Sequence, residues 1–299
     1  MLLHDLNKKN LIHPPKWLPD NTIYLTKMGS QAYGVSGGGS DVDIYGICIP
    51  PKEMIFPHLA GEIPGFGNQI KRFEVWQEHH VKDQNKAVEY DFSVYGIVKY
   101  FQLCMENNPN MIDSLFVPRN CVLHSTPVGE IVREARREFL HKGAWHKFKG
   151  YAYAQMSKIR NKQNASNPHR AETIEKFGYD VKFAYHCVRL MNEVEQILTE
   201  HDLDIQRNRE QLKSIRRGEW KLEDLEAYFT NKEHALELAY AASTLPHKPN
   251  EAKIKRLLLD CLEQHYGKLD HVINTGINMD NVISDLQAII VKLQAQQTG

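Results

Sequence analysis

The sequence predicts an α+β protein, with a small mixed β-sheet unit followed by a mainly α-helical unit. The chain has 299 residues, which is enough for two domains or one large domain. Its first part alternates short strand-like segments with turns. From about Glu130 onward, long stretches repeat apolar residues with the 3.6-residue period of a helix. We therefore expect a sheet-containing domain at residues 1–125 and a helical domain at residues 126–299.

The first part contains five segments with the pattern of strands. Alternating or β-branched residues, bounded by turn residues, indicate strands at 23–26, 41–51, 72–76, 87–92 and 121–125. Prolines and glycines without a clear period indicate a loop at 52–70. The polar segment "QEHHVKDQNK" is expected to join two strands, so we interpret His79 and His80 as a solvated strand end. Helical patterns are expected at 94–107 and 111–118, separated by "NPN".

The second part reads as a series of helices. The apolar period predicts helices at 127–142, 143–162, 171–201, 208–217, 221–242, 249–265 and 279–297. The sequence of these helices shows no internal repeat.

Composition excludes several classes of protein. With 42% hydrophobic and 25% charged residues, the chain resembles an ordinary globular protein. No apolar run approaches the ~18–20 residues of a membrane span, and the N-terminal residues lack a signal-type apolar core. Five well-separated cysteines without a C-x-x-C pattern argue against a disulfide framework or a zinc site. We therefore expect a cytoplasmic protein with reduced thiols and no membrane partner.

The segment from Gly29 to Asp43 has the pattern of a site for phosphate and metal. Asp41 and Asp43 stand two residues apart on a predicted strand, so their carboxylates point the same way. Two such anions repel unless a divalent cation lies between them, and Mg²⁺ prefers oxygen ligands of this kind. The upstream Gly29-Ser30 turn offers backbone N–H groups and a hydroxyl that can hold a polyphosphate. The alternative is a solvated strand edge, which the fixed spacing of turn and acids disfavours.

A two-metal site needs a further carboxylate from another strand. The segment "AVEYDF" offers Glu89 and Asp91, which share one face of the predicted strand.

The motif Gly29-Ser30, ten residues, then Asp41-Val42-Asp43 resembles the signature of the DNA polymerase β nucleotidyltransferase superfamily. Later segments are similar, in order, to blocks of the RlaP-like family of predicted bacterial and phage nucleotidyltransferases. These segments are "DFSVYGIVKYFQLCMENNPNMIDSLF", "KGYAYAQMSKI", "FGYDVKFAYHCVRLMNEVEQIL", "SIRRGEW" and "STLPHKPN". The resemblance covers roughly residues 22–259 and implies a palm-like sheet domain. The glycine run at 37–39 departs from the family pattern but keeps its length, which indicates a looser loop.

The resemblance also implies roles for individual residues. Gly29 and Ser30 correspond to the phosphate turn, and Asp41 and Asp43 to metal ligands. Asp91 corresponds to the third carboxylate, with Glu89 as the alternative.

The implied activity is nucleotidyl transfer. Two Mg²⁺ or Mn²⁺ ions would help to transfer a nucleoside monophosphate from an NTP or dNTP, with release of pyrophosphate. The favoured acceptor is the 3′-OH of RNA or single-stranded DNA, in RNA repair, tailing or untemplated synthesis. Two alternatives remain open. The acceptor could be a hydroxyl of a protein or small molecule, in a toxin, antitoxin or antiphage role. The chain could instead be an inactive nucleic-acid-binding module, although three intact acids argue against it.

Residues for nucleotide binding are also expected in the helical part. Lys182, His186 and Arg189 follow one another at i, i+4 and i+7, so they share a helix face. This face is a candidate contact for the triphosphate, and the alternative is an exposed basic stripe.

The segment 133–170 is the main candidate for binding nucleic acid. It holds ten Lys and Arg residues against two acids, with five interleaved aromatic residues. Positive charge with aromatic rings is typical of grooves for single strands. The candidate contacts are Lys147 and Lys158, with Arg216 and Arg217 of "SIRRGEW", where Trp220 could stack on a base. The alternatives are basic helices that balance acids elsewhere and charges that suit a helix C-terminus.

Overall fold

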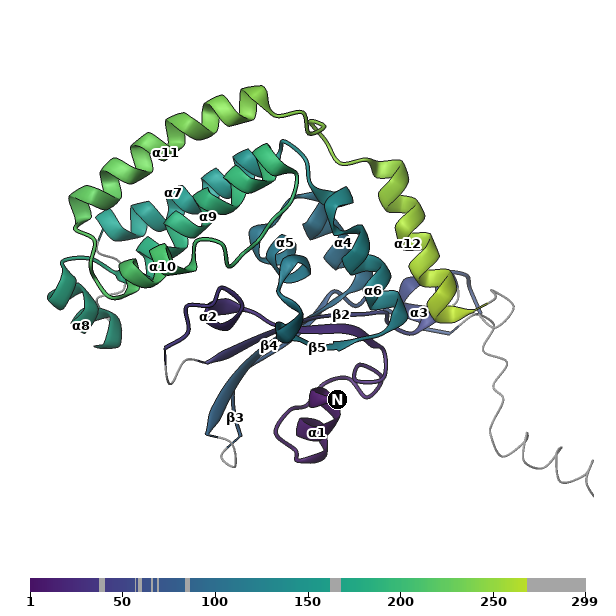
Figure 1. The fold of residues 1–299 in the computed structure, drawn as a ribbon. Coiled ribbons are helices and arrows are strands. Elements are labelled where there is room, and N and C mark those ends of the chain that lie inside the picture. The colour runs from purple at the N-terminus through teal and green to yellow at the C-terminus, as the bar shows by residue number, and fades with distance from the viewer. Residues whose placement is uncertain are drawn as a thin grey trace, which may run out of the picture.

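The computed structural model describes residues 1–37, 41–56, 58, 61–65, 67–68, 70–83, 87–161 and 168–267, without the side chains of 168–170. The predicted helix at 279–297 lies outside the described residues. Figure 1 shows a sheet with most helices on one side of it and the N-terminal helix α1 (Leu2–Lys8) on the other.

The sheet has five strands in the order β3-β4-β2-β1-β5. Its strands are β1 (Thr22–Lys27), β2 (Val42–Cys48), β3 (Val75–Asp83), β4 (Val88–Gly96) and β5 (Val122–Ser125). β2 and β4 pair in parallel, and the other neighbours pair antiparallel. The sheet is therefore mixed, and the predicted α+β class is confirmed.

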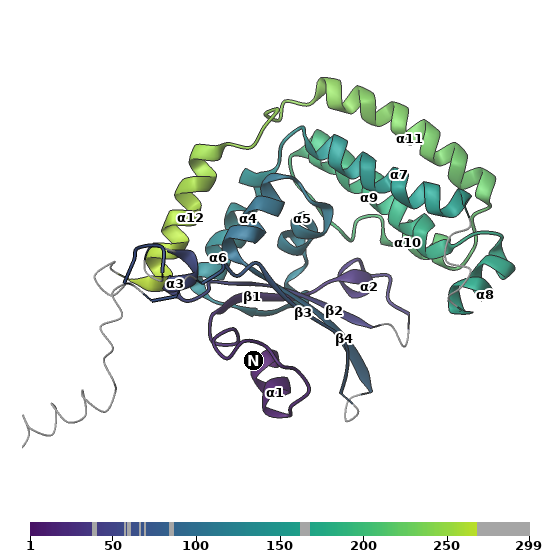
Figure 2. The ribbon, with the colours of Figure 1, turned by 180° about the vertical axis from the view of Figure 1, so that it is seen from behind.

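Each face of the sheet packs against a different part of the chain. Val42 and Ile44 of β2 are buried against Leu3 and Leu6 of α1, on the side away from the helices. Because side chains alternate along a strand, Asp43 points to the opposite face. The view from behind shows that this face lies under the helical part of the chain (Figure 2). The side chain of Asp43 therefore faces the helical part of the chain.

Helices make up the rest of the described structure. After the short α2 (Gly29–Ala32) and α3 (Lys52–Ile55) come α4 (Ile97–Met105), α5 (Pro109–Phe116), α6 (Pro127–Glu134), α7 (Ala144–Arg160), α8 (Pro168–Phe177), α9 (Val181–Glu200), α10 (Arg209–Arg216), α11 (Leu222–Ala242) and α12 (Glu251–Tyr266). Single 3₁₀ turns lie at Arg119–Cys121 and Ala135–Phe139. α7 packs along α9, α11 lies across α9, and α12 lies beside α6 and α4.

The predicted helix at 171–201 is two helices, which corrects the sequence prediction. Gly178 has a left-handed backbone, with φ at 83°, and ends the first helix. Asp180 then caps α9 by accepting hydrogen bonds from the backbone N–H of Lys182 (2.8 Å) and of Phe183 (3.3 Å). A glycine followed by an acidic cap therefore outweighs the continuous apolar period.

Strand β3 is also longer than predicted. It continues through the polar segment to Asp83, with a bulge between Glu78 and Val81. His79 and His80 thus lie inside the strand, and the prediction of a strand end there is wrong. Pairing with β3 likewise keeps residues 93–95 in β4, so α4 begins at Ile97 and not at 94.

Two smaller predictions also need correction. The helix expected at 127–142 ends at Glu134 and continues as a 3₁₀ turn to Phe139. The loop expected at 52–70 begins with the short helix α3.

The larger hydrophobic core includes residues from both predicted domains, from Ile23 of β1 to Leu262 of α12. The division at 125/126 therefore stays a prediction. Among the described helices, none combines the length and apolarity needed to cross a membrane.

Candidate active site

Asp43 and Asp91 are partners in the parallel pair formed by β2 and β4. Partnered residues on parallel strands project to the same face, so both carboxylates point toward the helices. Asp43 is partly buried, and Asp91 has 25% of its side chain exposed. Asp41, just before β2, is exposed and close enough to act electrostatically on Asp43. The structure thus brings the three predicted acids to one end of the same strand pair.

The charges around Asp43 make its ionised form costly. Burial raises the pKa of Asp43, and the neighbouring carboxylates of Asp91 and Asp41 add to the rise. The positive charge of Lys182, in the first turn of α9, and that of His79 act in the opposite direction. A divalent cation between the acids would relieve the same repulsion.

Gly29 lies directly against Asp43. A Cβ atom at residue 29 would come within 1.9 Å of Asp43 Oδ2, and the backbone there is left-handed, with φ at 61°. Both conditions require glycine. The backbone N–H of Met28 also donates to the carbonyl oxygen of Asp43 (2.7 Å). The predicted phosphate turn and a predicted metal ligand therefore form one contiguous unit.

Ser30 follows in α2, which has only four residues. The macrodipole of so short a helix is small, so the backbone N–H groups and the hydroxyl are the main attraction this turn offers to an anion.

Contacts from β3 distinguish Asp91 from Glu89. The backbone N–H of His80 donates to Asp91 Oδ1 (2.8 Å), and the His79 ring lies 3.5 Å from the same oxygen. The His80 ring instead hydrogen-bonds Glu89 (2.7 Å), and Lys82 lies 3.8 Å from Glu89. Both acids thus have partners on β3, but only Asp91 is the register partner of Asp43. This geometry favours Asp91 as the third carboxylate.

Sequence reasoning missed the role of the two histidines in holding the acids. His80 adopts a left-handed backbone, with φ at 59°, at the bulge of β3. The polar segment "QEHHVKDQNK", just before the strand that bears Glu89 and Asp91, is the sequence feature from which this contact could have been predicted.

The donor set fits a hard divalent cation, since Asp41, Asp43 and Asp91 supply only carboxylate oxygens. Across the described ranges, however, no three His, Cys, Asp or Glu side chains are already gathered closely enough to hold an ion. The acids would have to adjust their rotamers around an incoming ion.

The three candidates on α9 lie in different environments. Lys182 is exposed and acts electrostatically on Asp43, as described above. His186 is partly buried, with its ring 4.1 Å from that of Tyr185. Arg189 is only 4% exposed and is bound to Asp113 and Glu193. The expected basic face therefore does not reach the surface as a unit, and Arg189 is an internal residue.

Much of the basic charge of the 133–170 segment is paired with acids of other helices. Lys147 contacts Glu106 (2.9 Å). Lys149 contacts Glu233 of α11 (2.6 Å), and Arg160 contacts Glu226 of the same helix (3.2 Å). Lys158 lies over the ring of Phe183 on α9, 5.2 Å from its centroid. The alternative of basic helices that balance acids elsewhere thus describes part of this segment.

The aromatic residues of the segment also divide into two groups. Phe139, Trp145 and Phe148 are buried in the core, so the expectation that all five rings line a groove is wrong. Tyr151 and Tyr153 are 37% and 41% exposed, and the Tyr153 ring also packs edge-on against Phe229 of α11.

The arginines of "SIRRGEW" have local partners. Arg216 donates to the carbonyl oxygen of Val35 (2.6 Å), close to the phosphate turn. Arg217 contacts Glu219 at the surface. The Trp220 ring N–H donates to Ser214 Oγ (3.0 Å), and the ring packs on Tyr228. Trp220 is therefore partly buried and held by its neighbours, so it is poorly placed to stack on a base.

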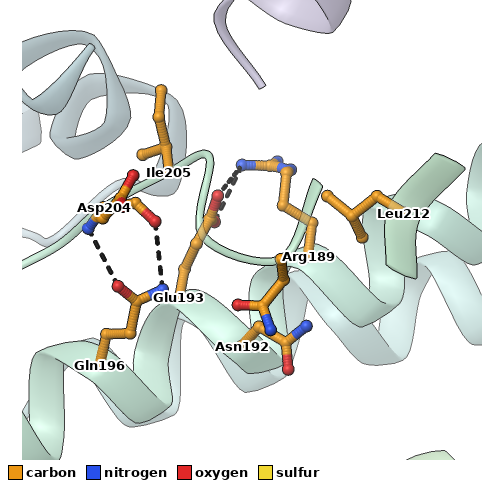
Figure 3. A pocket seen from close by; sticks show the side chains of 8 residues that line it. Arg189, Asn192, Glu193, Gln196, Asp204, Ile205 and Leu212 are labelled. Carbon is orange, nitrogen blue, oxygen red and sulfur yellow. Dashed lines mark hydrogen bonds and ion pairs between the residues drawn. The ribbon is translucent and has the colours of Figure 1, made fainter. Parts of the chain in front are cut away.

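A small pocket lies within the helical part (Figure 3). Its lining is Arg189, Asn192, Glu193, Gln196, Asp204, Ile205, Asn208 and Leu212. It contains none of the three predicted acids, so it is not the candidate active site.

Comparison with known proteins adds a family. Residues 4–271 match the family model RlaP, described as "RNA repair pathway DNA polymerase beta family". The chain is 26% identical over 139 residues to an uncharacterized 38.9 kDa protein of Enterobacteria phage T4, encoded in the nrdC-mobD intergenic region. That alignment covers 46% of this chain and 38% of the phage protein.

Among solved structures, the chain is similar to a nucleotidyltransferase-like protein from Exiguobacterium sibiricum 255-15. The match covers 87% of this chain and 74% of the other, with 8% identity and a TM-score of 0.29. A likeness at this level carries no argument about the site.

Proposed function

Because the chain belongs to the RNA repair pathway DNA polymerase beta family, we propose that it is a divalent-metal-dependent nucleotidyltransferase that uses Asp41, Asp43 and Asp91. The reaction is transfer of a nucleoside monophosphate from an NTP or dNTP to a hydroxyl group. One observation carries the proposal. Gly29 touches the Asp43 carboxylate, and Asp43 is the register partner of Asp91. A triphosphate bound by the turn would therefore lie directly beside the acids.

Each residue has a distinct role in this reaction. The Gly29 turn leaves room for the triphosphate to approach the backbone, and Ser30 offers a hydroxyl to a phosphate oxygen. Lys182 adds positive charge on the side of the helices. Bound Mg²⁺ or Mn²⁺, held by Asp41, Asp43 and Asp91, supplies neutralisation of charge on the α-phosphate and on the departing pyrophosphate.

The bond changes follow from this arrangement. The acceptor oxygen forms a bond to the α-phosphorus while the bond from that phosphorus to the bridging oxygen breaks. Pyrophosphate leaves with the electron pair, and Asp91 accepts the proton of the attacking hydroxyl.

We propose the 3′-OH of RNA or single-stranded DNA as the acceptor. The family description supports an association with RNA repair. Exposed Tyr151 and Tyr153 on α7 could stack on bases, with Lys147 and Lys158 on the same helix.

A second candidate acceptor is a hydroxyl of a protein or small molecule. The pairing of Lys149 and Arg160 with acids of α11 favours it, since paired cations attract phosphates less. The pairing of Asp43 with Asp91 argues against the inactive-module alternative, since a protein without catalysis has no need of these acids.

A single transfer assay tests the proposal. The purified protein is incubated with each labelled NTP and dNTP in Mg²⁺ or Mn²⁺, with RNA, single-stranded DNA or cell extract. The Asp43→Asn variant is the matched control. Metal-dependent label on a polynucleotide supports the favoured acceptor, and label on protein or on a small product supports the second. If no product is labelled under any condition, while a polymerase used as positive control is active, the proposed nucleotidyltransferase activity is refuted.

A further inference from the structure

The backbone just after the phosphate turn is held from the helical part of the chain. Gln206 Nε2 donates to the carbonyl oxygen of Ala32 (2.8 Å). Arg216 Nη1 donates to the carbonyl oxygen of Val35 (2.6 Å). Between these two contacts, the Tyr33 hydroxyl donates to Asp113 Oδ2 on α5 (2.8 Å). The residues that follow Gly29 and Ser30 are thus tied to α5, to α10 and to the turn that precedes α10.

Arg189 of α9 forms the centre of these contacts. Its guanidinium donates to Asp113 and to both oxygens of Glu193, at 3.0 and 2.9 Å. Its central carbon also lies 4.2 Å from the centroid of the Tyr33 ring, in a cation–π contact. The close view shows the head group of Arg189 turned toward Glu193 (Figure 3).

The cluster is buried, and this makes its geometry demanding. Tyr33, Asp113, Arg189 and Glu193 are each at most 4% exposed. A buried charge without its partner is costly, so the ion pairs of Arg189 with Asp113 and Glu193 restrict these groups to a narrow range of arrangements. The ring and hydroxyl of Tyr33 are part of this arrangement, which restrains the backbone at the end of α2.

The N-terminal end of the same helix faces the proposed metal site. Lys182 lies two turns before Arg189 on α9, and its charge acts on Asp43. Asp43 in turn touches Gly29. α9 therefore contacts Tyr33, just after the turn, through Arg189, and its Lys182 acts electrostatically on Asp43.

We propose that Tyr33 and Arg189 are positioning residues that hold the Gly29-Ser30 turn against Asp43, in the conformation that receives a triphosphate. The expected effect on catalysis rests on the proposed function. The restraint of the turn by Tyr33 and Arg189 can be measured without any activity. Neither residue contacts the reacting atoms. Both act through the position of the turn.

The test compares two tyrosine variants of the full chain. Tyr33→Phe removes only the hydroxyl that binds Asp113. Tyr24→Phe is the matched control, because Tyr24 is equally buried and its hydroxyl also donates a hydrogen bond, to the carbonyl oxygen of Ser114 (3.0 Å). Tyr24 lies in β1, which ends before the turn, and its hydroxyl bonds a backbone carbonyl of α5 and not the Asp113 carboxylate.

Two measurements are made on both variants. The first is amide hydrogen exchange of the peptide that covers residues 28–35, which should be faster in Tyr33→Phe and unchanged in Tyr24→Phe. The second is steady-state transfer. KM for the NTP should rise about two- to tenfold in Tyr33→Phe, the cost of one hydrogen bond, with kcat little changed. Tyr24→Phe should keep the KM of the wild type even where its thermal stability falls.

The two measurements separate this inference from the proposed function. Equal exchange at residues 28–35 in both variants would overturn the inference, whatever the activity. Equal KM in both variants would overturn it as well. Faster exchange in Tyr33→Phe alone, in a protein whose wild type transfers no nucleotide, would uphold the link and refute the proposed function.

Arg189→Lys gives a further check. It keeps the positive charge but loses the fork of donors, so it should speed exchange in the same peptide. If it fails to fold, the tyrosine pair still decides the question.

Discussion

Gly29 lies so close to Asp43 that a methyl group at residue 29 would collide with the Asp43 carboxylate. The residue proposed to approach the triphosphate and the residue proposed to bind the metal thus share one contact. A substitution at Gly29 should therefore affect metal binding by Asp43, and a substitution at Asp43 should affect triphosphate binding at the turn.

Gly29→Ala should therefore weaken NTP and metal binding strongly, although it adds only one methyl group. The left-handed backbone at residue 29 costs about 1–2 kcal/mol for a residue with a Cβ, and the added atom must displace Asp43. We expect weaker binding of NTP and metal by calorimetry. Gly150→Ala is the control, because nothing lies within 4 Å of its added Cβ and it is in the middle of a helix. Unchanged NTP binding in Gly29→Ala would exclude this turn as the phosphate site.

Ser30→Ala should have a smaller effect than Gly29→Ala or loss of an acid. It removes one hydroxyl contact to phosphate, on the order of 1.5–3 kcal/mol for a hydrogen bond to a charged group, while the backbone N–H groups stay. The NTP dissociation constant reports the loss. A Ser30→Ala protein as inactive as Asp43→Asn would show that the hydroxyl does more than bind phosphate.

Asp43→Asn should abolish nearly all transfer yet stabilise the metal-free protein. Because burial and the nearby acids raise the pKa of Asp43 in the folded state, its ionisation opposes folding. Metal-free wild type should lose stability as the pH rises from the ordinary aspartate pKa through the raised one, and the variant should lack this slope. Thermal unfolding in EDTA across pH measures it. A lower melting temperature for Asp43→Asn in EDTA at neutral pH would contradict this account.

Asp91→Asn and Glu89→Gln should separate the two candidates for the third carboxylate. Asp91 is the register partner of Asp43, while Glu89 bonds His80. We expect Asp91→Asn to lose nearly all transfer, and Glu89→Gln to retain most of it. The reverse order of activities would assign the role to Glu89.

For the sheet part of this site, the spacing of the residues is informative. Asp41 and Asp43 are two residues apart, so a strand is enough to place them on one face, and the glycine at 29 marks the turn. The pairing of Asp43 with Asp91 could not be predicted, since strand register depends on the whole sheet and on the bulge in β3.

The helical part is harder to predict because helical spacing does not say what covers a face. Lys182, His186 and Arg189 share a face by spacing, yet Arg189 is buried by Asp113 of α5 and Tyr33 of α2. The partners of Lys149 and Arg160 lie more than sixty positions away on α11, beyond the reach of any local pattern.

Lys147 and Lys158 offer a test of the acceptor. If α7 binds a nucleic acid, the logarithm of affinity should fall with the logarithm of salt by about 0.7 for each phosphate contacted on a single strand. Replacing both lysines by Gln should reduce that slope by one to two units and leave NTP binding unchanged. Lys253→Gln on α12 is the control for a paired surface lysine. A nucleic-acid affinity that does not change with salt concentration would favour a protein or small-molecule acceptor. A double variant that binds nucleic acid like the wild type would favour the same conclusion.

The central claim is that a divalent ion and a triphosphate meet between Asp43, Asp91 and the Gly29 turn. The most direct measurement is a crystal structure with Mn²⁺ and a non-hydrolysable NTP, with anomalous difference density to locate the metal. We predict a peak bridging the Asp43 and Asp91 carboxylates, with the β- and γ-phosphates against residues 29–30. Triphosphate bound elsewhere, or manganese that avoids both carboxylates while the NTP is bound, would contradict the account.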